Sequence, residues 1–372
     1  MKKGIRILVF IVWMIAAFGA VHLFRIYFPE VPDYEIGGFF GAFILTFWVH
    51  VILHETGHLL FGKLSGYQFV SFRVFGQTLV KQNGKLVRKK FKGWIGQALM
   101  LPPDMKNGTF PSVLYNLGGG LMNFLFGALF LGLFFIASPF WRFLLLAGAI
   151  SGILAGLISI VPQKPGGLPN DGYNALLLGR KGNADIRHAF WVQLHFNTAL
   201  ASGTRPRDIP TAWFEWVTPD NWNDPMVAAV AVIHYEYLLD RLELNEARSL
   251  AQTLLDTADK MLGTHKNQLR CELLFHELIN ECRPEEVGRI YTKELQAYIE
   301  TTPLYTSNQR MLYAYARLFT KDAAQTEAHW VLFLEACKSS ARLGEIPGEK
   351  ELVALVDRIA EGRNADLLAT IP

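Results

Sequence analysis

The stretch that decides the fold is GGFFGAFILTFWVHVILHETGHLLF, from Gly37 to Phe61. It is apolar and long enough to cross a hydrocarbon core of about 30 Å, which takes about 20 helical residues. Other stretches with the same character run from Ile5 to Tyr27, from Ser112 to Ser138 and from Phe140 to Val161. The sequence therefore predicts an all-α polytopic membrane protein with about four transmembrane helices.

The first of these apolar stretches has two interpretations. Lys2, Lys3 and Arg6 precede it and small residues stand around Ala17 to Ala20, as in a cleaved signal peptide. The apolar run continues past Ala20, however, and this favours an uncleaved transmembrane helix.

The second half of the chain has a different composition. From Arg180 onward the sequence carries charges and helical periodicity typical of a soluble domain. We therefore predict a transmembrane domain at residues 1–184 and a cytoplasmic α-helical domain at residues 185–372. The net charge of +3 is too small to indicate a nucleic-acid partner, because the basic residues gather beside membrane segments. Cys271, Cys282 and Cys337 show no CxxC spacing, which favours reduced thiols.

The charges of the loops predict the orientation, because Lys and Arg are retained on the cytoplasmic side. The N-terminus is basic, whereas the loop after the first helix carries only acids. The loop after the second helix is strongly basic: Lys63, Arg73, Lys81, Lys85, Arg88, Lys89, Lys90, Lys92 and Lys106. We expect an integral, multi-pass cell-membrane protein whose N-terminus, basic loop and C-terminal domain are cytoplasmic. The second and fourth helices then run in the same direction, and their C-terminal ends meet at one depth.

Within the basic loop, Tyr67 to Phe91 predicts a small β-hairpin. Its β-branched and aromatic residues flank Asn83 and Gly84, and Asn-Gly is the strongest short hairpin signal. Two functions remain open for this hairpin. It is either an edge strand that holds an extended substrate by backbone hydrogen bonds, or a positively charged surface hairpin that rests on lipid headgroups.

The second helix contains the pattern HExxH, from His54 through Glu55 to His58. Residues four apart share one face of a helix, so both imidazoles can bind one Zn²⁺. The adjacent Glu55 can then take a proton from water at the metal. Ionisable side chains within a transmembrane segment are costly and usually functional, which favours a metal site over a structural polar cluster.

A catalytic zinc ion needs a third protein ligand, and Asp171 is the candidate. The fourth helix ends near Pro162, and a segment rich in Pro and Gly leads to Asn170, Asp171 and Gly172. Irregular backbone at membrane depth is tolerated where it is buried in protein or lines a wet cavity. The parallel second and fourth helices bring Asp171 to the depth of the histidines. The alternative is that Asp171 only caps the helix that begins near Tyr173.

These residues resemble those of the site-2 protease family of intramembrane zinc metalloproteases. In that family, HExxH on one helix is joined by the Asp of an NxxPxxxxDG-like segment on a later helix. The matching segments here are His54 to His58 and Pro162 to Gly172. Gly119 to Asn123 looks like the family's GPxxN motif, with Gly120 in the Pro position, and Ser159 stands in place of the family's Asn.

The resemblance covers about residues 36–180, and it does not extend to the C-terminal half. It implies a zinc metalloendopeptidase that cuts a peptide bond in or near a transmembrane segment of a membrane-protein or signal-peptide-like substrate. It implies that His54, His58 and Asp171 hold the zinc ion, which polarises the scissile carbonyl and acidifies water. It implies that Glu55 takes the proton and passes it to the leaving amine.

Two further polar residues lie close to these motifs. Asn123 is a candidate for positioning the extended substrate or the oxyanion, and a buried Asn that joins two transmembrane helices is the alternative. His50 lies one turn before His54 on the same face, as a partner that orients a ligand or as an alternative ligand.

Helical periodicity continues through the C-terminal half. It is clearest in the segments Ala228 to Leu239, Leu244 to Met261, Gln268 to Ile279, Glu285 to Ile299 and Arg310 to Phe319. Paired helices recur about every 35 to 40 residues, which suggests a small α-solenoid of the tetratricopeptide kind. Such a domain offers a concave surface to a protein partner. A helical cap that stabilises or dimerises the enzyme is the alternative.

Two other classes of function are weighed against a protease. A membrane metal transporter also places His and Glu on transmembrane helices, but it needs a longer polar relay and usually more spans. An inactive protease fold would act as a membrane receptor or scaffold through the helical domain. The presence of Glu55 argues against this, because a dead scaffold has no need of the base.

Overall fold

The computed structural model describes residues 33–82, 85–90, 96–165 and 169–369, together with positions 15, 18, 19, 22 and 26. It is mostly helical, with one small β-sheet. The contacts divide the chain into two compact units, and the main boundary between them falls between Ala184 and Asp185.

Within the described part of the first unit, three helices are long and apolar enough to cross a membrane. They are α2 (Asp33–Leu64), α3 (Ser112–Ile136) and α4 (Pro139–Ile160). Their candidate spans, Gly37–Leu64, Ser112–Ile136 and Phe140–Ile160, agree with three of the predicted transmembrane stretches. The predicted first span, Ile5 to Tyr27, lies mostly outside the described residues.

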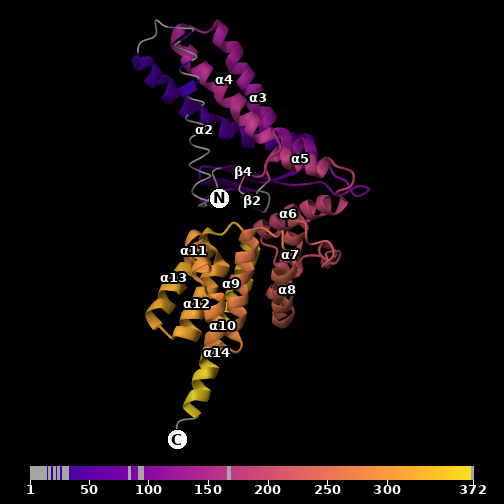
Figure 1. Ribbon diagram of the computed structural model, residues 1–372, viewed down its shortest axis with the longest axis vertical. Helices are drawn as coiled ribbons and strands as arrows, with labels where there is room; N and C mark the ends of the chain where they lie inside the picture. The colour runs from indigo at the N-terminus through magenta and orange to yellow at the C-terminus, as the bar shows by residue number, and fades with distance from the viewer. Residues whose placement is uncertain are drawn as a thin grey trace. The chain divides into compact units, whose positions relative to one another are not determined.

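Helices α2, α3 and α4 pack side by side, and α5 (Asp171–Gly179) lies at one end of them (Figure 1). Later residues of α2 contact later residues of α4. Phe43 lies in one apolar cluster with Ala147, and Thr46 accepts a hydrogen bond of 3.1 Å from Ser151. The two helices therefore run in the same direction, as the loop charges require. This arrangement brings the chain beyond α4 toward the second half of α2.

Small residues let α2 and α3 approach closely. A Cβ atom added to Gly57 would lie 2.3 Å from the carbonyl oxygen of Gly118. Only glycine allows this contact, and close approach through small residues is a common way to associate helices in lipid. Gly57 within HExxH and Gly118 of α3 therefore let α3 pack directly against the motif.

The basic loop forms a larger sheet than predicted. In place of one hairpin, the described residues of this loop form four strands: β1 (Gln68–Val74), β2 (Gln77–Gln82), β3 (Lys85–Lys90) and β4 (Gly96–Leu101). Their order is β3-β2-β1-β4, and β1 is antiparallel to both β2 and β4. The turn between β1 and β2 has positive φ at Phe75 and Gly76, which suits a two-residue hairpin turn. The predicted turn at Asn83 and Gly84 lies outside the described residues, between β2 and β3.

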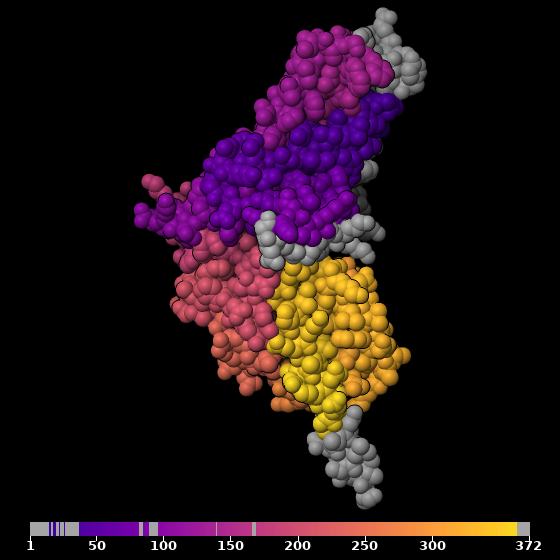
Figure 2. Space-filling model, turned by 180° about the vertical axis from the view of Figure 1, so that it is seen from behind, coloured from indigo at the N-terminus to yellow at the C-terminus, as the bar shows by residue number. Residues whose placement is uncertain are grey.

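The second unit is helical. Its α-helices are α6 (Ala184–Ser202), α7 (Pro225–Asp240), α8 (Leu244–Thr257), α9 (Gly263–Ile279), α10 (Pro284–Ile290), α11 (Lys293–Thr301), α12 (Thr306–Ala314), α13 (Ala323–Ser339) and α14 (Ile346–Ala369). Short 3₁₀ turns occur at Pro206–Asp208, Thr211–Trp213 and Leu343–Glu345, and a π-helical turn, η4 (Tyr315–Thr320), follows α12. Helices α12, α13 and α14 pack together, and their orange and yellow surfaces adjoin in Figure 2. The solenoid stays a prediction.

One predicted helix of this unit is wrong in extent. Glu285 to Ile299 was expected to be continuous, but it is divided between α10 and α11. The break falls at Thr292, whose hydroxyl accepts a hydrogen bond from the backbone N–H of Leu295 and so caps α11. Apolar spacing alone does not reveal this break, because a cap interrupts the helix without interrupting the apolar pattern.

A buried ion cluster joins α9, α12 and α14. The side chain of Arg310 is fully buried; it donates to Glu272 at 2.7 Å and to Glu349 at 2.8 Å. Tyr235 of α7 donates to the same Glu272 at 3.0 Å. A buried charge is tolerated when it is paired and hydrogen-bonded, so these contacts fix the relative positions of the helices.

Candidate metal centre

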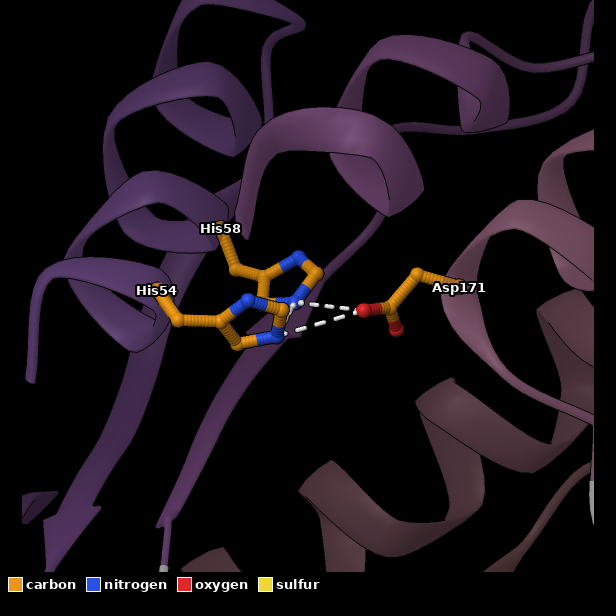
Figure 3. A group of neighbouring side chains, drawn as sticks. All are labelled: His54, His58 and Asp171. Atoms are coloured by element: carbon orange, nitrogen blue, oxygen red, sulfur yellow. Dashed lines mark hydrogen bonds and ion pairs between the residues drawn. The ribbon is translucent and has the colours of Figure 1, made fainter. Parts of the chain in front are cut away.

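Two imidazoles of α2 meet at one point. His54 and His58 lie one turn apart, and their Nε2 atoms are 3.1 Å from each other. Figure 3 shows both rings pointing toward the carboxylate of Asp171. The HExxH spacing therefore places the two histidines as a shared metal site requires.

Asp171 reaches the histidines at the start of α5. Its Oδ2 atom lies 3.2 Å from Nε2 of His54 and 3.5 Å from Nε2 of His58. These contacts come from residues more than a hundred positions apart in the chain. The structure thus brings together the three residues that the sequence singled out as metal ligands.

Asn170, and not Asp171, caps α5. Its Oδ1 atom accepts a hydrogen bond of 2.9 Å from the backbone N–H of Tyr173. Its Nδ2 atom donates to the carbonyl oxygens of Ile158, Ser159 and Val161, at the end of α4. Asn170 therefore ties the end of α4 to the start of α5. The carboxylate of Asp171 is left to face the histidines, so the capping alternative is wrong.

Gly172 allows this close junction. A Cβ atom added at this position would lie 1.9 Å from the carbonyl oxygen of Ile160. Any other residue would push α5 away from α4 and would carry Asp171 with it. Gly172 thus allows the close contact between α4 and α5 that positions Asp171.

The distances among the three donor atoms fit a zinc ion. A tetrahedral zinc ion with ligands at about 2.0–2.1 Å separates neighbouring ligand atoms by roughly 3.3 Å. The observed separations are 3.1, 3.2 and 3.5 Å. Two imidazole nitrogens and one carboxylate oxygen are also a donor set that zinc favours at catalytic sites. The arrangement leaves one tetrahedral position that no protein atom of this group occupies.

Hydrogen bonds orient two of the three ligands. Nδ1 of His58 lies 2.8 Å from the carbonyl oxygen of Tyr115, which can only accept, so Nδ1 carries the proton and Nε2 is free to bind a metal. The hydroxyl of Ser159 donates to Oδ2 of Asp171 at 2.8 Å. Burial by itself would raise the pKa of Asp171, but hydrogen bonds and charge from protonated His54 and His58 outweigh burial and lower it well below its usual range. A metal ion that takes the place of those protons would supply the positive charge instead and would keep Asp171 a carboxylate.

Glu55 lies beside β4. Its carboxylate accepts a hydrogen bond from the backbone N–H of Ala98, whose carbonyl oxygen accepts one of 3.0 Å from the hydroxyl of Tyr115. A Cβ atom added to Gly96 would lie 2.5 Å from Oε1 of Glu55. The strand thus supports the carboxylate by direct backbone contact. At Ala98 this edge of the sheet is occupied by the protein's own groups.

We expect the change Gly96→Ala to displace the Glu55 carboxylate. The family resemblance implies that Glu55 is the general base. A displacement of about 1 Å at such a group costs on the order of 100-fold in rate, so kcat should fall while zinc affinity stays unchanged. Zinc content and kcat of the purified variant measure the two effects. Gly41→Ala in α2 is the matched control, because a Cβ atom there meets nothing within 4 Å. An unchanged kcat for Gly96→Ala would show that β4 does not hold Glu55 in place.

Comparison with known proteins identifies the family. A model described as peptidase family M50 matches residues 42–342. The chain belongs to peptidase family M50. This confirms the resemblance to site-2 proteases, and the match also reaches well into the C-terminal half, beyond the predicted limit near residue 180. No curated protein and no solved structure gives a significant match to the chain.

M50 membership fits the chemistry of the site. The family consists of membrane-bound zinc metalloproteases, and the apolar helices α2, α3 and α4 agree with a membrane protein. In this M50 peptidase, Asn123 lies beside the candidate metal centre, with its side chain 3.3 Å from Nδ1 of His54. His50 does not join the group of three metal-binding side chains among the described residues.

Several residues of the site were not predicted for the roles that they take. In the sequence, Ser159 stands out only as a departure from the family pattern and Asn170 only as the residue before Asp171. In the structure, Ser159 orients Asp171 and Asn170 links α4 to α5. Tyr115 and Gly96 carry no motif at all. Their contacts depend on the three-dimensional approach of α3 and β4 to α2, and short-range sequence patterns carry no signal of that kind.

Proposed function

We propose that this chain is an intramembrane zinc endopeptidase that hydrolyses a peptide bond in or near a transmembrane segment of a membrane-protein substrate. The observation that carries the proposal is the convergence of His54, His58 and Asp171 beside Glu55, within and next to helices of membrane-spanning length. Because the metal-binding side chains lie within or next to membrane-spanning helices, the substrate has to present its scissile bond within or near the membrane.

The residues present suit a zinc ion held by His54, His58 and Asp171. When bound there, zinc supplies a Lewis acid that polarises the scissile carbonyl and lowers the pKa of water. Glu55 accepts the proton of the attacking water and delivers it to the leaving amine. The backbone N–H of Ala98 holds the Glu55 carboxylate during both transfers. Ser159 keeps Asp171 turned toward the histidines.

The proposed topology follows from the charges of the loops. The basic residues of the sheet and the N-terminus favour a cytoplasmic position for both, and the helical second unit then lies on the same side. We propose that the substrate helix unwinds before cleavage, because hydrolysis needs an extended backbone at the scissile bond. We propose that the second unit binds a protein partner that selects substrates or regulates cleavage.

The test compares membrane peptides from cells that carry the wild-type chain with those from cells that carry Glu55→Gln. The proposal predicts fragments that end within or near transmembrane segments and that are present only with the wild-type chain. Identical peptide sets in the two cell lines, at equal protein levels, would contradict it. The fragments found only with the wild-type chain also identify the substrate.

Neither alternative class gains support from a specific observation. Membership of a peptidase family gives a metal transporter no basis, and zinc uptake by sealed vesicles without peptide cleavage would be needed to favour it. An inactive scaffold does not require the contacts that hold Glu55 next to the metal-binding group.

A further inference from the structure

A chain of hydrogen bonds leads from α4 to the first histidine of the candidate metal centre. Nε2 of His50 lies 2.9 Å from the carbonyl oxygen of Gly148, and Nδ1 of His50 lies 3.3 Å from the Asn123 side-chain atom assigned as Oδ1. The atom assigned as Nδ2 of that amide lies 3.3 Å from Nδ1 of His54. His50 and Asn123 are each only 1% exposed, so water does not replace these contacts.

The polarity of this chain can be deduced from its first member. A carbonyl oxygen only accepts hydrogen bonds, so Nε2 of His50 carries a proton and donates it to Gly148. A charged imidazolium is costly within apolar helices, so His50 is neutral and its Nδ1 has a lone pair. That lone pair needs a donor, and the only polar side chain described in contact with it is Asn123.

The amide of Asn123 must therefore present its NH₂ group to His50. The two ends of an amide have nearly the same shape, and here the hydrogen-bond network requires that the assigned positions of Oδ1 and Nδ2 be exchanged. With NH₂ toward His50, the amide oxygen faces His54 and accepts the proton of its Nδ1. A neutral His54 that is protonated at Nδ1 has its lone pair at Nε2, the atom that points at Asp171. The opposite orientation of the amide would place a proton on Nε2 of His54 and would block metal binding.

We propose that His50 and Asn123 are positioning residues that set the tautomer of His54 for metal binding, through the relay Gly148, His50, Asn123 and His54. The proposal rests on the proposed zinc site and adds a function for two residues outside the ligand set. His58 reaches the same state more directly, because the carbonyl oxygen of Tyr115 accepts the proton of its Nδ1.

The packing around both rings supports a fixed relay. A Cβ atom added to Gly119 would lie 2.4 Å from Cε1 of His54, and one added to Gly152 would lie 2.5 Å from Cε1 of His50. Each imidazole thus fills the space above a glycine of a neighbouring helix, which restricts its rotation. Rings held in this way keep their nitrogen atoms aimed at the same partners.

The test measures zinc affinity of the full-length protein in detergent, by competition with a chelator. Loss of a partner that orients a metal ligand typically lowers affinity by about 10- to 100-fold, and we expect Asn123→Leu to fall in this range. His50→Leu should lower affinity in the same direction. The double variant should match Asn123→Leu alone, because His50 acts only through Asn123. His50→Asn keeps an acceptor toward Asn123 and should retain more affinity than the similarly sized His50→Leu.

The matched control is Thr46, whose buried hydroxyl also joins α2 to α4, through a hydrogen bond of 3.1 Å with Ser151. Ser151 is not a control, because its hydroxyl also donates to the carbonyl oxygen of Gly148 in the relay. Thr46 has no described contact with a member of the relay or with the metal-binding group, so Thr46→Val should leave zinc affinity unchanged. If Thr46→Val lowers zinc affinity as much as Asn123→Leu does, the effect is one of helix packing and the relay is wrong.

Two other outcomes separate the relay from the zinc site on which it rests. Wild-type zinc affinity in Asn123→Leu would overturn the relay alone, and a raised KM in that variant would instead favour a substrate-positioning role for Asn123. Wild-type zinc affinity in His54→Ala would overturn the metal centre itself, and the relay with it.

Discussion

Replacing Glu55 with Gln is expected to abolish peptide-bond hydrolysis and to leave zinc binding intact. Gln has nearly the same shape as Glu, and its amide oxygen can still accept the hydrogen bond from Ala98. It has no carboxylate to take the proton of the attacking water. General acid–base catalysis contributes about 10²- to 10⁴-fold to a rate, so kcat should fall by at least that factor.

The test measures kcat and zinc content of the purified wild-type and Glu55→Gln proteins. Any peptide that the wild type cleaves can serve as the substrate. Thr56→Val is a suitable control, because the one described hydrogen bond of the Thr56 hydroxyl stays within α2, to the carbonyl oxygen of Ile52. It should keep both zinc and activity. An active Glu55→Gln enzyme would rule out Glu55 as the general base.

Replacing Asp171 with Ala is expected to remove one of the three protein ligands. Loss of a residue that merely orients a ligand costs about 10- to 100-fold in affinity, and loss of a ligand should exceed about 100-fold. Ser159→Ala should give a smaller decrease, because Ser159 only donates to the Asp171 carboxylate. The graded series is measured by chelator competition on the intact protein.

The exposed Asp104 provides the control for removal of an acidic charge from the same unit. Asp104→Ala should bind zinc as the wild type does. If Asp171→Ala also retained wild-type affinity and activity, the third ligand would have to be another residue. The proximity of Asp171 to His54 and His58 would then be an ion contact without a catalytic role.

The parts of the fold that could be predicted are those with strong local signals. The spans of α2, α3 and α4 follow from continuous apolar runs, and HExxH fixes two side chains on one helical face. Asp171 could be added because loop charges predict that α2 and α4 run in parallel. Each of these predictions needs only the sequence of one segment, or the single rule that Lys and Arg are retained on the cytoplasmic side.

The parts that could not be predicted depend on contacts between distant segments. Strand β4 lies beyond the hairpin that was predicted at Tyr67 to Phe91, yet it packs against Glu55 through Gly96. The predicted hairpin was therefore too small. Asn123 was considered as a residue that binds substrate or joins helices, and its contacts with His50 and His54 emerge only when α2, α3 and α4 are assembled.

The most direct test of the account is X-ray absorption at the zinc edge of the purified full-length protein. We predict one zinc ion per chain with only nitrogen and oxygen ligands at about 2.0–2.1 Å, including two imidazoles. The same signal should be lost in His58→Ala and changed in Asp171→Ala. A protein that is active without bound zinc, or a zinc signal that stays the same in both variants, would contradict the assignment of His54, His58 and Asp171 as the metal centre.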